Sequence, residues 1–400
     1  MHLRSIRDVK SWKGKRVFLR VDFNVPIVRG KVAPGGDWRI ERALPTIGYL
    51  THHGARVILG THLGRPGGRA RAALRLDPIA KRLGTLLGGG RVKKLPECVG
   101  RKVAQAVAKM RNGELVLLEN LRFHSGEDTD DPKFAKELAT LADVYVNDAF
   151  AVSHREAASV VAITKELPSY AGLLLEEEVA VLSRVTTRAK KPLVALLGGA
   201  KISTKIGTIQ NLARKAGTVL LGGAITNTIF AARGYGVGAS LISKEDFALA
   251  KKLRSSKKLE LPVDAVIGDP KHPERTARVV EIRATPHEVC PKKFAIFDIG
   301  PRTVALYAGF LKRAQTIVWN GPLGWFEVRS GSHATRALAR LIAARSSGRA
   351  FGVVGGGETI QALHETHMAH FVDHVSTGGG AMLEFLAGKT LPGIKPLIKK

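Results

Sequence analysis

Short apolar runs alternate with amphipathic stretches along the whole of the 400-residue chain. Apolar runs that end at Gly, Pro or polar residues are typical of strands buried on both faces of a parallel sheet. Stretches with apolar residues three and four positions apart predict helices between the strands. The predicted strands occupy 16–21, 56–60, 114–118, 144–146, 193–197, 218–221, 264–267, 316–319 and 351–354. This alternation predicts an α/β protein built on parallel sheets.

Several predicted helices carry recognisable start signals. Asp77 stands before a proline and predicts the N-cap of one helix, and Asp131 predicts the N-cap of another. Arg39 opens a helical pattern in which Pro45 predicts either a kink or a later start. The long amphipathic pattern over 171–188 predicts either an ordinary surface helix or a hinge between two halves.

The length of the chain exceeds what one hydrophobic core serves, so two domains are expected. We place them at 1–170 and 190–380, with the hinge helix over 171–189 and a tail over 381–400. The N-terminus has no signal-peptide core, and no apolar run approaches the roughly 20 residues that span a bilayer. Cys98 and Cys290 stand far apart and predict neither a disulfide framework nor a zinc site. A cytoplasmic protein is expected.

The charge is strongly positive, with 63 Lys and Arg against 34 Asp and Glu and a formal net charge of +29. Such a balance attracts polyanions. The basic residues are scattered along the chain, and aromatic residues, on which bases could stack, make up only 6%. We therefore expect an anionic substrate and at most non-specific binding of polyanions, rather than a dedicated nucleic-acid binder.

Predicted strands of the first half run into polar turns that carry cations. The turn residues are Asp22 and Asn24, His62 and Arg65, Arg122, and His154 and Arg155. Each turn alone fits ordinary turn chemistry. Because ligands bind at the carboxyl ends of strands in open α/β sheets, the repeated pattern predicts one anion-binding face.

Glycine pairs and triplets follow the strands of the second half. They are Gly198–Gly199, Gly222–Gly223, Gly355–Gly357 and Gly378–Gly380. Because glycine lets the backbone approach a bulky anion, these turns predict a nucleotide held largely by main chain. A helix that opened at Ser203 would place Lys201 and Lys205 on one face near its N-terminus, while the alternative is an ordinary turn with solvated lysines. Neither a Walker A loop nor a dinucleotide fingerprint occurs.

A series of motifs, in order and from end to end, resembles the phosphoglycerate kinase family. They are Arg20–Pro26, His62–Pro66, Glu119–His124, Val146–Phe150 with His154 and Arg155, Leu197–Lys201, Leu261–Asp264, Asp298–Pro301, Val318–Gly324 and Ser376–Gly380. The resemblance implies two doubly wound, Rossmann-like domains joined by the hinge helix, with a cleft between them and a tail that packs on the first domain. It implies reversible phosphoryl transfer between 1,3-bisphosphoglycerate and ADP, giving 3-phosphoglycerate and ATP, by a monomer that uses Mg²⁺.

The resemblance also implies roles for individual residues. The triose ligands would be Asp22, Phe23, Asn24, Arg39, His62, Leu63, Gly64, Arg65, Arg122 and Arg155. The nucleotide ligands would be Gly199, Lys205, Gly222, Gly223, Asn320, Pro322, Glu327, Gly355, Gly356, Gly357, Glu358 and Thr359. Arg39, Lys201 and Lys205 resemble the catalytic cations, and Glu358 resembles the residue at the metal. Phosphoryl transfer depends on in-line positioning and positive charge at the equatorial oxygens, and domain closure would exclude water.

Two residues depart from the pattern of the family. Its metal-proximal residue is usually Asp, and Glu358 keeps that carboxylate on one more methylene. Thr204 stands where an Asp often precedes the catalytic lysine, which removes a negative charge beside Lys205. Both changes leave the reaction class intact.

Two other functions fit parts of the pattern. A different phosphoryl-transfer enzyme would share the cations and glycine turns, and a non-catalytic basic protein would bind RNA or DNA. Salt dependence distinguishes them, because polyanion binding falls steeply with salt whereas binding of a Mg-nucleotide depends on it modestly.

Overall fold

The computed structural model describes residues 1–90, 92–215, 217–253 and 258–399. The chain forms two compact units. Unit 1 comprises Met1–Val181 and Thr390–Lys400, and unit 2 comprises Leu182–Lys389. The helix α6, Leu173–Arg188, begins in unit 1 and ends in unit 2. The helix predicted over 171–188 is therefore confirmed.

Unit 1 is built on a parallel sheet in the strand order β5–β6–β4–β1–β7–β8. In chain order these strands are β1 Arg16–Arg20, β4 Arg56–Gly60, β5 Lys93–Lys94, β6 Leu115–Leu117, β7 Val144–Asn147 and β8 Ser169–Ala171. The helices are α1 Trp38–His52, α2 Asp77–Leu86, α3 Arg101–Ala108, α4 Ser125–Asp128 and α5 Pro132–Ala139, and a hairpin pairs β2 Ile27–Val28 with β3 Lys31–Val32.

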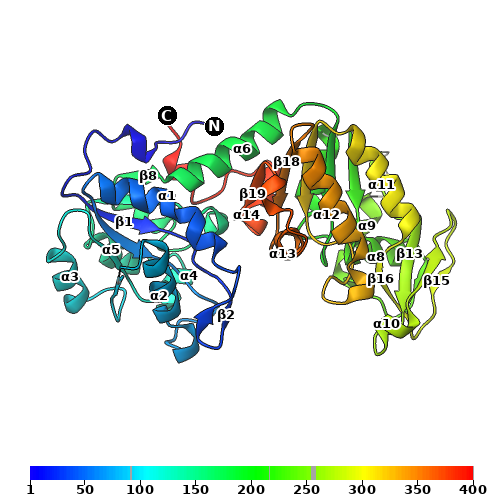
Figure 1. Ribbon diagram of the computed structural model, residues 1–400, viewed down its shortest axis with the longest axis horizontal. Coiled ribbons are helices and arrows are strands. Elements are labelled where there is room, and N and C mark those ends of the chain that lie inside the picture. The colour runs from blue at the N-terminus through cyan, green and yellow to red at the C-terminus, as the bar shows by residue number, and fades with distance from the viewer. Residues whose placement is uncertain (91, 216, 254–257, 400) are drawn as a thin grey trace. The chain divides into compact units, whose positions relative to one another are not determined.

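Alternate residues of β1 show how the two faces of this sheet are covered. Val17 and Leu19 belong to a core that includes apolar side chains of α1 and α2. Phe18 belongs to a separate core that includes side chains of α3 and α5. Because successive side chains of a strand point to opposite faces, the sheet is doubly wound (Figure 1).

Unit 2 contains a second parallel sheet in the order β12–β10–β9–β17–β18–β19. Its strands are β9 Leu193–Leu197, β10 Thr218–Leu221, β12 Leu259–Glu260, β17 Thr316–Asn320, β18 Phe351–Gly355 and β19 His374–Ser376. The helices are α7 Ile206–Lys215, α8 Ala224–Ala232, α9 Phe247–Lys252, α10 Pro273–Thr276, α11 Pro301–Arg313, α12 His333–Ser346, α13 Gly357–Glu365 and α14 Gly379–Leu386. Val194 and Leu196 of β9 share a core with side chains of α11 and α12, while α7 contacts β9 and β10 and packs against α14.

The strand predicted at 264–267 exists but does not continue the parallel sheet. It is β13, Asp264–Gly268, and it pairs antiparallel with β14, Arg278–Glu281, and β16, Ala295–Ile299. Beside it, β11 Gly236–Val237 pairs with β15 Glu288–Cys290. The edge strand β14 is largely exposed, an exposure that antiparallel sheets tolerate and buried parallel sheets do not.

Two predicted helix starts are wrong, and in both a charged partner distant in sequence explains the difference. Helix α7 begins at Ile206 rather than Ser203, because Asp246 Oδ2 accepts hydrogen bonds from the backbone N–H of Ile202 and Ser203 and holds them in a separate turn. Lys201 and Lys205 therefore precede α7 and do not share a helical face.

Helix α2 begins at Asp77 itself, with Leu76 as its N-cap. The carboxylate of Asp77 pairs with Lys94 Nζ at 2.9 Å instead of capping the helix. Asp131, by contrast, caps α5 as predicted, with its side chain 2.9 Å from the backbone N–H of Lys133. Pro45 lies inside α1, so the alternative of a later helix start is wrong.

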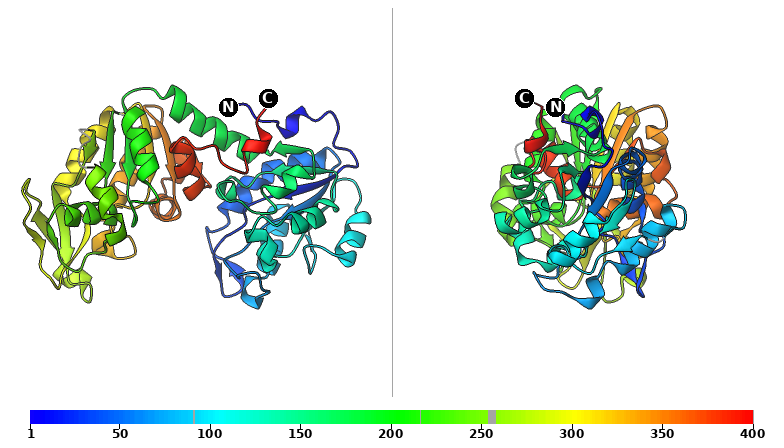
Figure 2. Two further views of the ribbon diagram at one scale, coloured as in Figure 1. Left: turned by 180° about the vertical axis from the view of Figure 1, so that it is seen from behind. Right: turned by 90° about the vertical axis from the view of Figure 1, so that its left-hand side faces the viewer.

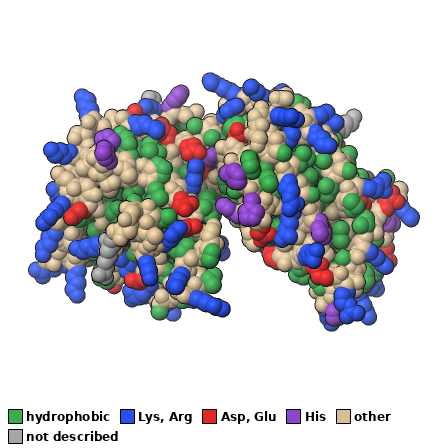
Figure 3. Space-filling model, viewed as in Figure 1, with side chains coloured by type: hydrophobic (Ala, Val, Ile, Leu, Met, Phe, Trp, Pro, Cys, Tyr) green, Lys and Arg blue, Asp and Glu red, His purple; other side chains and the backbone are tan. Residues whose placement is uncertain are grey.

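Both ends of the described chain lie in unit 1 (Figure 2). Leu3 forms an antiparallel bridge with Ile398, and Gly393 O accepts a hydrogen bond from Asn147 Nδ2 of β7 at 3.0 Å. Lys and Arg side chains are spread over the visible face of both units rather than gathered in one patch (Figure 3). Among the described residues, no helix combines the length and apolar character needed to cross a membrane.

Candidate functional site

The polar turns predicted in the first half follow neighbouring strands of unit 1, in the order β6, β4, β1 and β7. Arg39 reaches the turn after β1 from the first turn of α1. Its Nη1 donates to Asp22 Oδ2 at 2.8 Å and to the backbone oxygen of Asn24 at 3.3 Å. Asn24 Oδ1 accepts from the backbone N–H of Gly64 at 2.9 Å. Side-chain hydrogen bonds therefore join the turns after β1 and β4 into one site.

His62 lies buried at the centre of this site. Its Nδ1 is 3.5 Å from Arg20 Nη2 and 3.8 Å from Asp22 Oδ1. Burial lowers the pKa of His62 well below its ordinary value. Nearby arginines lower it further, and they are Arg20, Arg122, Arg155 and Arg39. The imidazole is therefore neutral at pH 7 within a strongly cationic surrounding.

Arg122 is also buried, and its guanidinium is already engaged. Nη1 donates to the backbone oxygen of Gly64 at 3.0 Å, and Nε pairs with Asp128 Oδ1 at 3.0 Å. Burial lowers the pKa of Arg122, although an arginine remains charged at physiological pH. Arg65 and Arg155 are exposed and carry their charge at the surface of the site.

Phe23 and Leu63 occupy predicted site positions but point into the core of unit 1. The backbone N–H of Phe23 donates to Thr61 Oγ1, and that of Leu63 donates to Asn120 Oδ1. Their side chains therefore fix the shape of the turns. An anion with several charged oxygens suits the cluster that remains around them.

In unit 2, the predicted glycine turns pack backbone against backbone. The N–H of Gly199 donates to Pro322 O at 3.0 Å, and the N–H of Gly223 donates to Leu323 O at 2.7 Å. A Cβ on Gly198 would lie 1.9 Å from Pro322 O, and Gly199 and Gly223 have positive φ angles of 107° and 67°. Only glycine fits these positions, so the turns after β9, β10 and β17 meet at one place.

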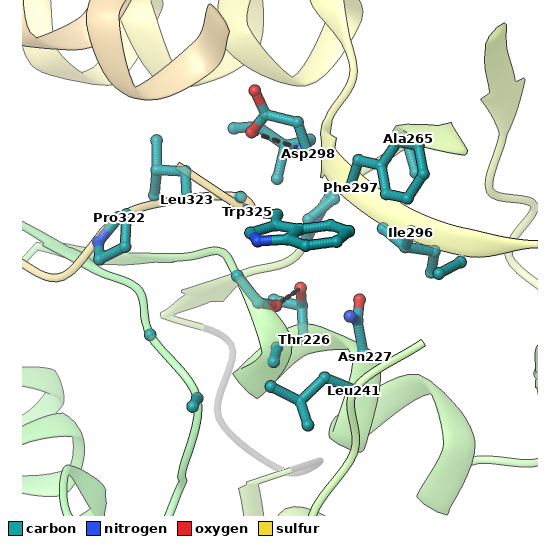
Figure 4. Close-up of a pocket in the computed structure, with 18 of the residues that line it drawn as sticks. Thr226, Asn227, Leu241, Ala265, Ile296, Phe297, Asp298, Pro322, Leu323 and Trp325 are labelled. Atoms are coloured by element: carbon teal, nitrogen blue, oxygen red, sulfur yellow. Dashed lines mark hydrogen bonds between the residues drawn. The ribbon is translucent and has the colours of Figure 1, made fainter. Parts of the chain in front are cut away.

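A cavity of about 470 Å³ opens beside these turns (Figure 4). Residues predicted for nucleotide binding that line it are Gly199, Gly223, Pro322, Glu327 and Glu358. Much of the remaining wall is apolar and comes from α8, β16 and the loop after β17. A pocket that is apolar on one side and polar on the other suits a ligand with an aromatic part and a charged part.

The apolar side of this cavity was not predicted from the sequence. Trp325 lines it with 41% of the residue exposed, and its ring lies across from Thr226, Asn227 and Leu241. Phe297 meets the indole edge to face, with centroids 5.8 Å apart and an interplanar angle of 64°. The only sequence signal was an aromatic residue directly after a glycine turn. An exposed indole on a cavity wall offers a flat surface to a planar ligand.

Glu327 and Glu358 line the polar side of the cavity, and Lys205 lies close enough to interact with the charge of Glu358. Lys205 Nζ donates to Asn320 Oδ1 at 3.1 Å, and burial lowers the pKa of Lys205 to about 8, opposed by the charge of Glu358. Burial raises the pKa of Glu358, and the charge of Glu327 raises it further. Glu358 lies in the first turn of α13, which starts after Gly356 with φ of 100°. The lysine and the helix N-terminus both favour an anion here.

Other predicted residues lie behind the cavity wall or away from it. Gly222 packs against Leu323, and Gly355 packs so closely on Met382 that a Cβ would lie 2.3 Å from its sulfur. Thr359 Oγ1 accepts a hydrogen bond from the N–H of Gly321 at 2.8 Å. These residues support the turns. Lys201 is exposed, with its Nζ 3.5 Å from Glu245 Oε1.

Gly357 completes the predicted set, and a Cβ there would meet no atom within 4 Å. In the part of the chain that the structure describes, no three His, Cys, Asp or Glu side chains gather as a metal-binding group. Glu358 and its neighbour Glu327 provide two carboxylates. That number suits Mg²⁺, which keeps several waters and is held in proteins by one or two carboxylates together with the phosphates of its ligand.

Comparison with known proteins gives one consistent result. The family model described as phosphoglycerate kinase matches residues 6–389. The phosphoglycerate kinase of Pelotomaculum thermopropionicum is 46% identical over 100% of both chains, and that of Moorella thermoacetica is 46% identical over 96% of this chain and 97% of its own.

Solved structures agree with these sequences. The phosphoglycerate kinase of Coxiella burnetii has a TM-score of 0.81 and 38% identity, with 99% of both chains covered. That of Pyrococcus horikoshii has a TM-score of 0.84 and 31% identity, with 99% of this chain and 98% of its own covered. The fold is therefore shared along nearly the whole chain.

Proposed function

This chain belongs to the phosphoglycerate kinase family and transfers a phosphoryl group reversibly between 1,3-bisphosphoglycerate and ADP, and from that premise we propose which of its residues bind the reactants. The triose binds at the basic site of unit 1, and the nucleotide binds in the cavity of unit 2. The observation that carries this assignment is the contrast in chemistry: one site is dense in fixed cations, and the other joins an apolar wall to glycine turns.

We assign the triose to residues that present charge or N–H groups at the strand ends of unit 1. Arg65, Arg122 and Arg155 bind the non-reacting phosphate. Asp22 and Asn24 orient the glycerate hydroxyl, and neutral His62 donates a hydrogen bond without adding charge. This distribution separates recognition of the phosphate from the reacting end of the molecule.

The nucleotide base stacks on Trp325, and the ribose faces Glu327. The phosphates reach the turn at Gly199, Lys205 and the start of α13 at Gly357. Stacking on an aromatic side chain binds any base through its π-face, and helix N-terminal N–H groups bind phosphate oxygens.

Arg39 and Lys205 bind the phosphoryl group during transfer. Arg39 is held by Asp22, and Lys205 is held by Asn320, so each cation is positioned before the ligands arrive. Positive charge that is already in place stabilises the developing charge without reorganisation. Lys201, which pairs with Glu245 at the surface, has a supporting role.

Glu358 would hold Mg²⁺ together with the nucleotide phosphates. The metal, when bound, supplies positive charge to those phosphates. The departure from Asp to Glu at this position lengthens the side chain and leaves the carboxylate in place.

A coupled assay with ATP and 3-phosphoglycerate tests the assignment of the activity to this chain. Turnover that requires Mg²⁺ and saturates in both substrates is expected. A folded sample that turns over in neither direction, with the metal varied, would contradict the proposed sites. Calorimetry then assigns the ligands: Mg-ADP binding is expected to respond to substitutions in unit 2, and 3-phosphoglycerate binding to substitutions in unit 1.

A further inference from the structure

Behind the basic site of unit 1 lies a buried network of polar groups. Glu127 of α4 is 1% exposed, and its Oε1 is 3.5 Å from Nη2 of Arg20, which is equally buried. Ser159 bridges the two: its Oγ accepts from Arg20 Nε at 2.7 Å and donates to Glu127 Oε1 at 2.6 Å. The N–H of Ser159 donates to Glu127 Oε2 at 3.0 Å.

The chemistry of these three side chains determines which group donates and which accepts in each hydrogen bond of the network. A guanidinium only donates, so the Ser159 oxygen must accept from Arg20. An ionised carboxylate only accepts, so the Ser159 hydroxyl hydrogen must point to Glu127. Arg20 Nη1 is used as well, since it donates to Val21 O at 2.5 Å. Ser159, Glu127 and the backbone oxygen of Val21 therefore fix the orientation of the Arg20 guanidinium.

This fixed arginine meets His62. Arg20 Nη2 is 3.5 Å from Glu127 Oε1 and 3.5 Å from His62 Nδ1, and its two hydrogens can serve both. His62 Nδ1 must accept there, because a proton on Nδ1 would face the N–H of Arg20. Asp22 Oδ1, at 3.8 Å, would favour the opposite tautomer but is farther away and shares its carboxylate with Arg39.

We propose that Glu127 is a positioning residue that acts through Arg20 and fixes His62 as the neutral tautomer with its proton on Nε2. In that tautomer Nε2–H is a hydrogen-bond donor to the anionic ligand. The charged groups that face His62 are Asp22, Arg20, Arg122, Arg155 and Arg39. The arginines disfavour the imidazolium, so the tautomer persists through neutral pH. The role of the donor rests on the proposed triose site, whereas the tautomer does not.

Nitrogen-15 NMR of the ring nitrogens of His62 in the free protein tests the tautomer without any assay of activity. A pyridine-like Nδ1 and a pyrrole-like Nε2, unchanged from pH 6 to pH 8, are expected. A protonated Nδ1, or an imidazolium at pH 7, would overturn the proposal even if the enzyme were fully active. If the expected tautomer were found in a protein that did not bind 3-phosphoglycerate, the proposed function alone would fail.

The variant Glu127→Gln tests the positioning role. We expect mixed tautomer signals at His62 and a KM for 3-phosphoglycerate raised about tenfold, as for loss of one charge-assisted hydrogen bond, with a much smaller change in kcat. Glu119→Gln is the matched control, since Glu119 is 2% exposed and pairs with Lys94 and Arg75 instead. It is expected to lower stability and leave the His62 signals unchanged.

Ser159→Ala provides a second route if Glu127→Gln does not fold. It removes the acceptor of Arg20 Nε and is expected to shift the His62 signals in the same direction by less. Unchanged His62 signals together with an unchanged KM in a folded Glu127 or Ser159 variant would overturn the positioning role.

Discussion

The proposed ligand sites of unit 1 and unit 2 differ in what holds them in shape. In unit 1 charged side chains hold one another, as in the pairs of Arg39 with Asp22 and of Arg122 with Asp128. In unit 2 the backbone sets the shape, through glycines so close to Pro322 that a side chain could not fit. The first arrangement recognises charge at defined points, and the second recognises the outline of a flat ligand with a charged end.

This difference predicts how substitutions at each site change catalysis and ligand affinity. Substitution of Arg39 removes a charge and leaves the buried Asp22 without that partner, so effects on catalysis and binding are expected to be large and specific. A substitution in the apolar wall of unit 2 removes contact area, so the expected loss is in affinity alone. Four measurements test the contrast, here in order of decreasing effect.

Arg39→Ala is expected to lower kcat on the order of 10²-fold or more, because Arg39 is the positioned donor to the phosphoryl group. Arg65→Ala is the matched comparison, since Arg65 is exposed and is proposed to bind only the non-reacting phosphate. It should mainly raise the KM for 3-phosphoglycerate. Steady-state kinetics decide the matter, and equal changes of kcat and KM in both variants would contradict the assignment.

Trp325→Ala is expected to weaken Mg-ADP binding about tenfold, the range of aromatic–base stacking, and to leave 3-phosphoglycerate affinity unchanged. Trp325→Phe is the conservative control and should retain most of the affinity. Calorimetry gives both constants. Indole fluorescence adds a direct readout, because binding should quench the wild-type signal more than that of the variants. Tight binding by the alanine variant would exclude stacking.

The pH dependence of binding separates the two sites through Lys205. With a pKa of about 8, Lys205 is protonated below that pH and loses its charge as pH rises through it. Mg-ADP affinity should therefore be full near pH 7 and fall severalfold by about pH 9. An arginine side chain keeps its positive charge throughout this pH range, so the affinity of unit 1 for 3-phosphoglycerate should not change with pH.

Lys205→Arg is the control for this titration, because arginine keeps its charge. Its Mg-ADP affinity should not fall between pH 7 and pH 9. A wild-type protein whose affinity is equally flat would show that Lys205 does not contact the nucleotide anion.

Thr204→Asp is expected to give the smallest effect. Thr204 is exposed, with its hydroxyl 2.9 Å from Lys201 O, so a carboxylate there would be screened by solvent. We expect Mg-ADP binding to weaken by roughly twofold to fivefold and 3-phosphoglycerate binding to remain the same. Thr204→Asn controls for the change of shape. Unchanged or tighter nucleotide binding in the aspartate variant would make Thr204 a neutral replacement.

The charged site was the easier of the two to predict from sequence, for a physical reason. Charged residues that follow successive strands are unusual in a hydrophobic core, so Arg65 and Arg122 could be recognised from the sequence as candidate ligands. Phe297 and Leu241, which line the cavity, resemble ordinary core and surface residues, and only the folded chain brings them together. Trp325 stood beside a recognised motif, but its exposure could not be foreseen.

The predicted elements show the same limit. Strands with strong apolar runs, such as β9, were located correctly because their signal is local. The start of α7 was wrong because the carboxylate that blocks an earlier start belongs to Asp246, far along the chain. The separate sheet of β13 was missed because the sequence pattern of a strand does not show which other strands it pairs with.

The bridge from Leu3 to Ile398 has a consequence for how the protein is made. A ribosome synthesises the whole of unit 2 before it adds residues 390–400, which belong to unit 1. The hydrogen bond from Asn147 Nδ2 to Gly393 O can therefore form only at the end of synthesis. Unit 2 is continuous in sequence and can close its sheet during translation, whereas unit 1 begins first and finishes last. The nascent chain thus carries all six strands of the unit 1 sheet from residue 171 onwards, but lacks the C-terminal residues that pack on that unit until synthesis ends.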